Sequence, residues 1–580
     1  MAGAGPSRRV LAAEAALLGL FVLALTSWFA AWPPGLPPGL PFGALVLGLA
    51  WRVVRSGWRP RPPALETVTC LVLAVAYRFP ALLHPWGWVN RDGAYGAFAA
   101  LHMLDGVRPA PVFTEGANYQ GTLKSHVAAL LGLVGGAGDP SLLMTASSLA
   151  LFLACVWATM ALARRAGGPA AALAAGLYLA IGPRFLTVFS LNCVGQYVDV
   201  LALGGLALAA IAPLLDRGLA GAEARIHYTV AGLLLGAAFW QQPVALAYAG
   251  AVIAALALRK TTWRDPWALL FPLGALAGVL PVLLWNAQNE WATGEILGRE
   301  PEHLRAQVEA FPLLVRRAIF VSFPILAGVS PGHPWAEWPA VRTAAALLPL
   351  AALGAYLLLH RRALVPDLRS GPSSALLAPL LMAACVGLFW AVASGRVYWR
   401  PRYLLPVAAA TAVHLGVVLG WVFGRSRAAA VAALGAVLAL NAAGTLPRLR
   451  ASAEVAEPYR RLVRSLEAKG IRTGYADFSL AAPVTMFTAE RIVLSPALGP
   501  TDAYESPHHA TRLAEQGPDA YVLLGDDESE RFAAVLRALG ISFRLDPDPF
   551  PVFYAFSRPP RLEEVVGFRG EVVPRPPPEE

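Results

Sequence analysis

The chain has 580 residues, of which 57% are hydrophobic and only 14% are charged. Soluble domains carry roughly a quarter charged residues, so the composition excludes an ordinary soluble protein and indicates one that crosses a membrane many times. The formal net charge of +10 fits the Lys/Arg bias of cytoplasmic loops, and no nucleic-acid partner is needed to explain it. Four cysteines, all in or beside apolar segments, favour neither a disulfide framework nor a metal site.

Apolar segments of about 20 residues, the length that crosses a bilayer, recur along the chain. The pair 228–240 and 243–258 is short and forms either two thin spans or a re-entrant hairpin, because "QQP" separates its members. The segment 313–326 carries two arginines in its middle and is expected to lie in the membrane interface. The sequence predicts a polytopic α-helical membrane protein with about 13 transmembrane helices, at 10–32, 38–54, 65–83, 142–163, 169–189, 197–215, 228–240, 243–258, 266–286, 339–359, 373–394, 403–423 and 427–446.

Positively charged residues in the short loops predict the orientation of these spans. Lys and Arg precede the first predicted span and follow the second, fourth, sixth, eighth, tenth and twelfth. All of them fall on one side if thirteen segments cross the membrane. We therefore expect a cytoplasmic N-terminus, an extracytoplasmic C-terminus and an extracytoplasmic loop over residues 84–141, within a transmembrane domain that extends over residues 1–450.

The composition becomes more polar from about residue 450. An amphipathic helix is predicted over 457–470, where Gly470 ends it. Strand-like segments follow at 471–478, 491–496, 520–525 and 541–545, and a helix is predicted at 528–540, between the last two. Alternating strands and helices favour a small extracytoplasmic α/β domain over residues 451–570. The Pro-rich end, residues 571–580, is predicted to be a disordered tail.

Asp92 stands at the point where the loop 84–141 begins a new helical pattern, "AYGAFAALHML", directly after "RDG". Asp is a preferred N-cap residue, and a carboxylate suits the positive end of a helix. The alternative is a catalytic carboxylate at the membrane face. The two interpretations are compatible, because a carboxylate held by helix amides can still accept a proton.

Cationic residues near the predicted outer face provide candidate phosphate ligands. Lys124 either extends toward the headgroup region or meets an anionic phosphate there. Arg396, Arg400 and Arg402 lie between two apolar spans, on the side where the positive-inside bias disfavours them. A guanidinium suits phosphate, and the alternative is an aromatic-belt anchor that includes Tyr403.

Other polar residues carry weaker signals. Arg184 lies near the end of a predicted span, and an intramembrane charge is costly unless it faces a partner or water. "SLNCVGQYVD" puts Gln196 and Asp199 at an outer membrane face, where capping a span and binding a ligand are equally good interpretations. No Walker loop, G-x-S-x-G or H-E-x-x-H motif occurs in the chain.

The order of these features resembles the GT-C superfamily of glycosyltransferases that use lipid-phosphate sugars. "NRDGAYGAFAALHMLDGVRP" is similar to the family's Asp-x-x-Tyr, helix and Gly-x-x-Pro, and "NYQGTLKSHVAALL" resembles its stretch that re-enters the membrane. "FWQQPVALAY", "PVLLWNAQN" and "RPRYLLPV" resemble further recurrent segments. The chain looks most like bacterial relatives of protein O-mannosyltransferase and of the lipid A aminoarabinose transferase, the glycosyltransferase family 39 type. The Trp-Trp-Asp signature of oligosaccharyltransferases is absent.

The resemblance implies roles for individual residues. Asp92 would be the general base that deprotonates the acceptor hydroxyl. Lys124 and an arginine of "WRPRY", Arg400 or Arg402, would bind the donor phosphate. Further substrate contacts are expected from Arg91, Tyr95, Glu115, Tyr119, Gln120, Arg184 and Tyr403. Arg91 before Asp92 departs from the family, which often has a second acid beside its loop acid.

The predicted function is transfer of a sugar from a polyprenyl-phosphate donor to a hydroxyl acceptor, on the extracytoplasmic side of a bacterial inner membrane. The acceptor would be a glycolipid, an envelope glycan or a protein. No cofactor is expected, and a divalent metal is not expected either, because cations can clamp the leaving phosphate. The alternatives are a transporter or flippase of lipid-linked substrates, for which internal repeats are expected but not found, and a non-catalytic scaffold.

Overall fold

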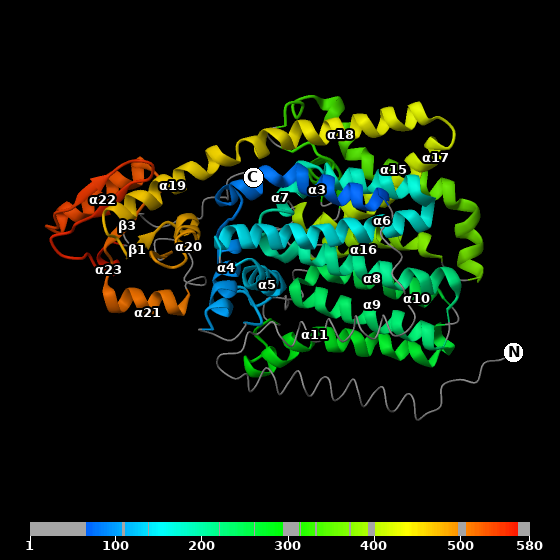
Figure 1. Cartoon of the computed structure of the whole chain (residues 1–580), viewed down its shortest axis with the longest axis horizontal. Coiled ribbons are helices and arrows are strands. Elements are labelled where there is room, and N and C mark those ends of the chain that lie inside the picture. The colour runs from blue at the N-terminus through cyan, green and yellow to red at the C-terminus, as the bar shows by residue number, and fades with distance from the viewer. Residues whose placement is uncertain are drawn as a thin grey trace.

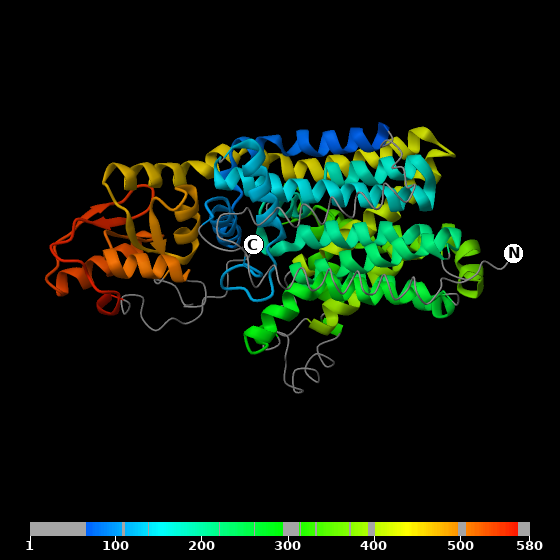
Figure 2. The same ribbon diagram turned by 60° about the horizontal axis from the view of Figure 1, so that its bottom comes forward.

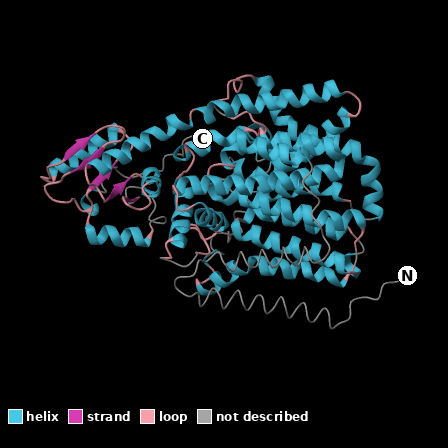
Figure 3. Ribbon diagram, in the orientation of Figure 1, coloured by secondary structure: helices cyan, strands magenta, loops and turns pink. Residues whose placement is uncertain are grey.

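The computed structural model shows a bundle of long helices with a smaller part, built of helices and strands, at one end (Figure 1). It describes residues 65–106, 111–136, 138–219, 221–259, 262–293, 312–313, 315–330, 333–370, 373–392, 401–496 and 506–565. The predicted spans 10–32 and 38–54, the tail 571–580 and the candidate Arg400 lie outside the described residues. Strands occur only at the C-terminal end in Figure 3.

The helices of the bundle largely follow the predicted apolar segments. Seven helices of the described part are long and apolar enough to cross a membrane, which supports a multi-pass membrane protein. The number of crossings remains a prediction. The helices are α3 (Leu65–Leu83), α4 (Arg91–Leu104), α5 (Leu123–Gly135), α6 (Pro140–Ala180), α7 (Arg184–Phe189), α8 (Tyr197–Arg217), α9 (Ala222–Gln241), α10 (Leu246–Leu258), α11 (Leu270–Gln288), α14 (Phe323–Leu326), α15 (Pro339–Ser370), α16 (Leu377–Val392), α17 (Leu405–Phe423) and α18 (Arg427–Arg450).

The element α6 contains two of the predicted spans. Gly168 inside it has φ 80° and ψ −170°, a conformation outside the helical region, and Pro169 follows. A Cβ on Gly176 would lie 2.6 Å from the sulfur of Met160, so the two arms pack against each other. The chain therefore reverses at Gly168, and the predicted break between 163 and 169 is confirmed. The second arm ends at Ala180 rather than 189, because Gly182 and Pro183 interrupt the helix before α7.

Helices α9 and α11 approach each other backbone to backbone. A Cβ on Gly236 would lie 2.1 Å from the carbonyl oxygen of Ala275, and one on Gly278 would lie 2.3 Å from that of Leu233. Small residues four apart allow this close approach in membrane helices. The helix α9 begins at Ala222, six residues before the predicted 228, because the charged segment "AEARIH" continues the helical backbone. The prediction placed the start of this helix too late.

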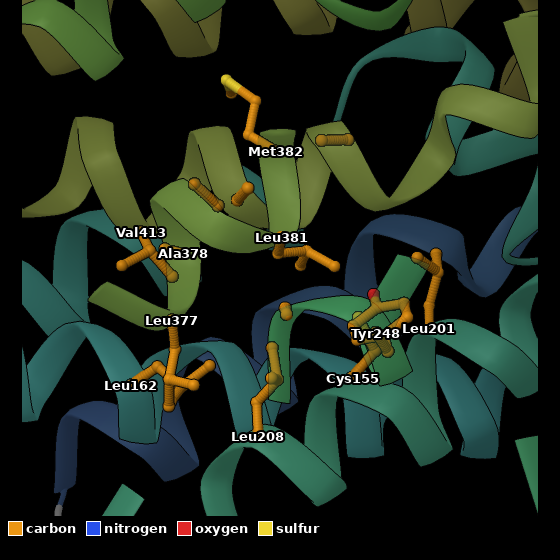
Figure 4. Packing of buried hydrophobic residues seen from close by; sticks show 14 of the residues in the cluster. Cys155, Leu162, Leu201, Leu208, Tyr248, Leu377, Ala378, Leu381, Met382 and Val413 are labelled. Carbon is orange, nitrogen blue, oxygen red and sulfur yellow. The ribbon is translucent and has the colours of Figure 1, made fainter. Parts of the chain in front are cut away.

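The interior of the bundle is packed with apolar side chains from α6, α8, α10, α16 and α17. Figure 4 shows Cys155, Leu201, Tyr248 and Leu381 in this cluster. A Cβ on Gly204 would lie 2.4 Å from the ring of Tyr248, so α8 and α10 also need a small residue where they meet. All four cysteines are buried and free.

One arginine is buried inside the bundle and was not among the predicted site residues. Arg78 of α3 has no exposed surface. It donates hydrogen bonds of 2.7 Å to the carbonyl of Ala180 and to the hydroxyl of Ser190, and it lies over the ring of Phe152. The carbonyls at a helix C-terminus lack intrahelical partners, so a cation there is stabilising. Arg78 thus stabilises the C-terminal end of α6.

The C-terminal part contains one five-stranded sheet with the order β2-β1-β3-β5-β4. β1 (Thr473–Ala476) pairs in parallel with β2 (Val493–Ser495) and β3 (Ala520–Val522); β5 (Val552–Tyr554) pairs antiparallel with β3 and with β4 (Arg544–Asp546). Its helices are α19 (Ser452–Ala468), α20 (Phe478–Phe487), α21 (Pro507–Gln516), α22 (Asp526–Ala538) and α23 (Leu562–Val565). All four predicted strand segments contribute strands to this sheet, whereas β5 was not predicted.

The C-terminal part and the helix α4 share one apolar core. Ala94, Ala97 and Phe98 of α4 are buried in the same cluster as Leu480 and Val484 of α20. Figure 2 shows the C-terminal part lying against the end of the bundle from which α4 begins. The first predicted polar loop and the last part of the chain are therefore one packed unit.

Candidate active site

The helix α4 is capped by Asn90 and not by Asp92. The side-chain oxygen of Asn90 accepts a hydrogen bond of 3.1 Å from the amide of Gly93, and the helix begins at Arg91. The interpretation of Asp92 as the N-cap, one of the two that the sequence left open, is therefore wrong. Asn is as good a cap as Asp, and the sequence "NRDG" offers both residues two positions apart. Asp92 lies inside the first turn, where the helix dipole favours a carboxylate.

Asp92 is held by its neighbour in the chain. The Nε and Nη2 atoms of Arg91 donate to Oδ1 of Asp92 over 3.3 and 3.1 Å, and the side chain of Asp92 keeps 19% of its surface exposed. The guanidinium carbon of Arg91 lies 3.7 Å from the ring centroid of Phe478, the first residue of α20. One carboxylate oxygen of Asp92 is therefore bound by a guanidinium, and part of the side chain stays open to solvent.

Arg402 and Tyr403 lie in a short 3-10 helix, Pro401–Leu404, directly before α17. The guanidinium carbon of Arg402 lies 5.9 Å from the ring centroid of Tyr197 and 5.5 Å from that of Tyr403. Its Nε is buried and has no hydrogen-bond partner among the described residues. Asp92 interacts electrostatically with Arg402, and Tyr119 does so with Tyr197. Asp92, Tyr119, Arg402 and Tyr403, four of the predicted site residues, thus lie within electrostatic range of one another or of Tyr197 at one end of the bundle.

Lys124 is fully buried and ion-paired. Its Nζ lies 3.2 Å from Oδ2 of Asp199, and neither side chain has any exposed surface. Cys193 lies beside this pair, and a Cβ on Gly93 would lie 2.9 Å from the Cβ of Cys193, so the pair sits behind the first turn of α4. The sequence did not indicate Asp199 as the partner. The binding of a phosphate by Lys124 stays a prediction.

The loop before Lys124 is a compact turn fixed to the bundle. Thr114 and Gln120 are joined by a backbone hydrogen bond of 2.8 Å. Gln241, from the "QQP" motif, accepts from the amide of Gly121 through its carbonyl and from that of Leu123 through its side chain. The loop that carries Glu115, Tyr119 and Gln120 is thereby held at the end of α9.

Two further candidates lie in different surroundings. Tyr95 is 3% exposed and packs edge-on against Phe98, with 5.7 Å between the ring centroids, inside the core shared with α20. Arg184 begins α7 and acts electrostatically on Arg448 of α18. Their predicted contacts with substrate stay predictions.

Three further residues lie at the candidate site: Tyr197 and Phe478, which the sequence analysis did not name, and Gln196, for which it gave only a weak signal. Tyr197 and Phe478 were not named, because an aromatic residue at a helix start looks like a packing residue in a sequence. Gln196 has a left-handed φ of 55°, is 2% exposed, and its Oε1 has no partner among the described residues. Backbone strain in a non-glycine residue persists where its surroundings fix it, and it is frequent at functional sites.

Among the described residues, no group of three or more His, Cys, Asp and Glu side chains could hold a metal ion. That the reaction needs no divalent metal stays a prediction.

The helices define a multi-pass membrane protein. Its candidate site, which contains Asp92 and Arg402, lies at one end of the helical bundle. No protein-family model matches the sequence, and no curated protein matches it. Two solved structures of ArnT from Cupriavidus metallidurans are similar. The apo form has a TM-score of 0.52 at 15% identity, over 83% of this chain and 97% of that chain. The form bound to undecaprenyl phosphate has a TM-score of 0.54 at 16% identity, over 84% and 98%.

The chain therefore has a fold similar to that of ArnT, a GT-C glycosyltransferase, and this likeness agrees with the resemblance that the sequence motifs indicated.

Proposed function

We propose that the protein is a membrane glycosyltransferase that moves a sugar from a polyprenyl-phosphate donor to a hydroxyl acceptor, on the extracytoplasmic side of a bacterial inner membrane. The observation that carries the proposal is the electrostatic interaction of Asp92 with Arg402 at one end of a bundle that has the fold of ArnT. Asp92 is a partly exposed carboxylate, and Arg402 has a buried Nε with no partner among the described residues. The undecaprenyl phosphate bound to ArnT supports a lipid-phosphate donor.

Asp92 and Arg402 each act on a different part of the reaction. The acceptor oxygen forms a bond to the anomeric carbon while its proton moves to Asp92. The bond between the anomeric carbon and the phosphate oxygen breaks, and the electron pair leaves with the polyprenyl phosphate. Arg402 stabilises the charge that develops on that phosphate. Direct displacement of this kind inverts the anomeric centre.

In this mechanism, the positive charge of Lys124 acts on the donor phosphate through its electrostatic field. Its charge is shared with Asp199, and the pair is buried behind the first turn of α4. Because the pair has no exposed surface, Lys124 acts on the donor phosphate through its charge and not through a direct contact. We assign the first contact with the donor phosphate to Arg402 and a supporting role to Lys124.

The test is sugar transfer by the purified protein from polyprenyl-phosphate sugars extracted from membranes, measured as released polyprenyl phosphate. Asp92→Asn should lower the rate by about 10²–10⁴-fold, the usual contribution of a general base. Asp105→Asn is the matched control, because Asp105 ends the same helix and is exposed. Full activity of Asp92→Asn would refute the assignment of the base.

Binding of undecaprenyl phosphate tests the clamp separately. Arg402→Ala should weaken binding by about tenfold or more, as expected for a charged hydrogen bond, whereas Asp92→Asn should bind normally. Arg402→Lys should recover only part of the affinity, because an ammonium lacks the planar fork of the guanidinium. A flippase would instead move the labelled lipid between leaflets of a vesicle without releasing any sugar.

A further inference from the structure

Helix α4, which carries Asp92, is contacted at both ends by the C-terminal part of the chain. At its first turn, Arg91 holds Asp92 and also lies on the face of Phe478, 3.7 Å from the ring centroid. A guanidinium over an aromatic face is attracted by the ring's negative charge, more strongly where water is excluded. Phe478 is the first residue of α20, so the C-terminal part reaches the candidate base through a single intervening side chain.

At the last turn of α4, His102 is bound by Glu490. The Nε2 atom of His102 lies 3.0 and 3.1 Å from the two carboxylate oxygens of Glu490, and Nε2 of His509 in α21 lies 2.6 Å from one of them. The ring of His509 also packs edge-on against Phe98 of α4, with 4.8 Å between the centroids. Glu490 thus joins α4 and α21.

The backbone around Glu490 is unusual. Ala489 and Glu490 both have left-handed φ angles, 46° and 60°, which L-residues with a side chain rarely adopt. The conformation is held by hydrogen bonds from the amide of Glu490 to Thr485 and from Arg512 to the carbonyl of Glu490. Strained residues of this kind persist where the surrounding structure fixes them, and here the strain directs one carboxylate at α4.

We propose that the C-terminal part is a component of the active site, and that Phe478 and Glu490 are positioning residues that fix the two ends of α4 and, through Arg91, the direction of the Asp92 carboxylate. The inference rests on the proposed function. It goes beyond that function because it gives the C-terminal part a catalytic task.

Kinetics distinguish positioning from simple packing. Phe478→Leu keeps an apolar side chain but removes the aromatic face, and it should lower kcat about fivefold, the value of a modest cation–π contact, with the donor KM unchanged. Phe478→Tyr restores the face and should restore kcat. A wild-type rate in Phe478→Leu, or a Phe478→Tyr variant as slow as Phe478→Leu, would overturn the proposal.

Hydrogen exchange of α4 in the full-length protein is a second, activity-independent readout. Glu490→Gln should speed exchange in the last turn of α4, and Phe478→Leu in the first turn. Asp546→Asn is the matched control, since Asp546 binds Lys469 within the C-terminal part. Unchanged exchange in α4 would overturn the proposal. If the wild-type protein transfers no sugar, the proposed function fails, while the exchange pattern still decides whether the C-terminal part fixes α4.

Discussion

The α9–α11 contact and the α4 end of the bundle are stabilised in opposite ways. In the first, glycines let the backbones of two helices approach closely. In the second, an ion pair without exposed surface lies next to a carboxylate held by an arginine. Close packing of small residues specifies a shape and stabilises it, whereas buried charges cost desolvation and are retained where they have a task. The difference supports the placement of the proposed active site at the α4 end of the bundle.

The largest expected effect on stability comes from removing one member of the buried ion pair between Lys124 and Asp199. Lys124→Met leaves Asp199 charged and buried, and breaking such a pair costs about 3–5 kcal/mol. The double variant Lys124→Met/Asp199→Leu should recover most of this free energy of unfolding, measured by denaturation in detergent. If the double variant is stable yet inactive, the pair serves the reaction. A double variant with full activity would make the pair purely structural.

A smaller effect is expected from the glycine contact. Gly236→Ala places a Cβ 2.1 Å from the carbonyl oxygen of Ala275, so the helices must separate, and overpacking costs about 1–3 kcal/mol. Gly354→Ala in α15 is the control, because a Cβ there meets no atom within 4 Å. The apparent melting temperature should fall for the first variant and stay level or rise for the second. Equal behaviour would show that α9 and α11 tolerate separation.

The smallest effect is a dependence of stability on pH. Burial alone would raise the pKa of Glu490, but hydrogen bonds from His102 and His509 outweigh it and hold the pKa of this carboxyl well below its usual range. A carboxyl with a lowered folded-state pKa adds stability above its unfolded pKa, about 4.3, and loses it as the pH falls further. The melting temperature of Glu490→Gln should therefore lie below that of the wild type at pH 7, and the gap should close in acid. Glu515→Gln, an exposed acid on α21, should show no gap at either pH.

Much of the fold follows from local pattern, and the site follows only in part. Apolar runs gave most helices to within a few residues, and the gap between the predicted spans 142–163 and 169–189 contains Gly168, where the chain reverses because glycine and proline interrupt a helix. The sequence left open whether Asp92 caps α4, and Asn90 is the cap because Asn and Asp are equally good cap residues. β5 was missed because it has only three residues, directly after Pro547, Pro549 and Pro551, and carries almost no periodicity.

The sequence could not predict which residues pair when they lie far apart along the chain. Lys124 and Asp199 are 75 positions apart, and nothing in either segment indicates that their charges meet. The burial of Arg78 was hidden for the same reason, because its acceptors belong to the ends of other helices. A cationic residue in an apolar run signals that a partner exists, but the fold alone reveals which one.

The contact between His102 and Glu490 joins residues 388 positions apart. A ribosome makes α4 early and α20 and α21 near the end of the chain. The bundle can therefore enter the membrane while the first turn of α4 still lacks Phe478 and its last turn still lacks Glu490. Under the proposed function, a partly synthesised chain would carry the Asp92 carboxylate without the residues that fix its direction, and it would become active only after α20 and α21 are made.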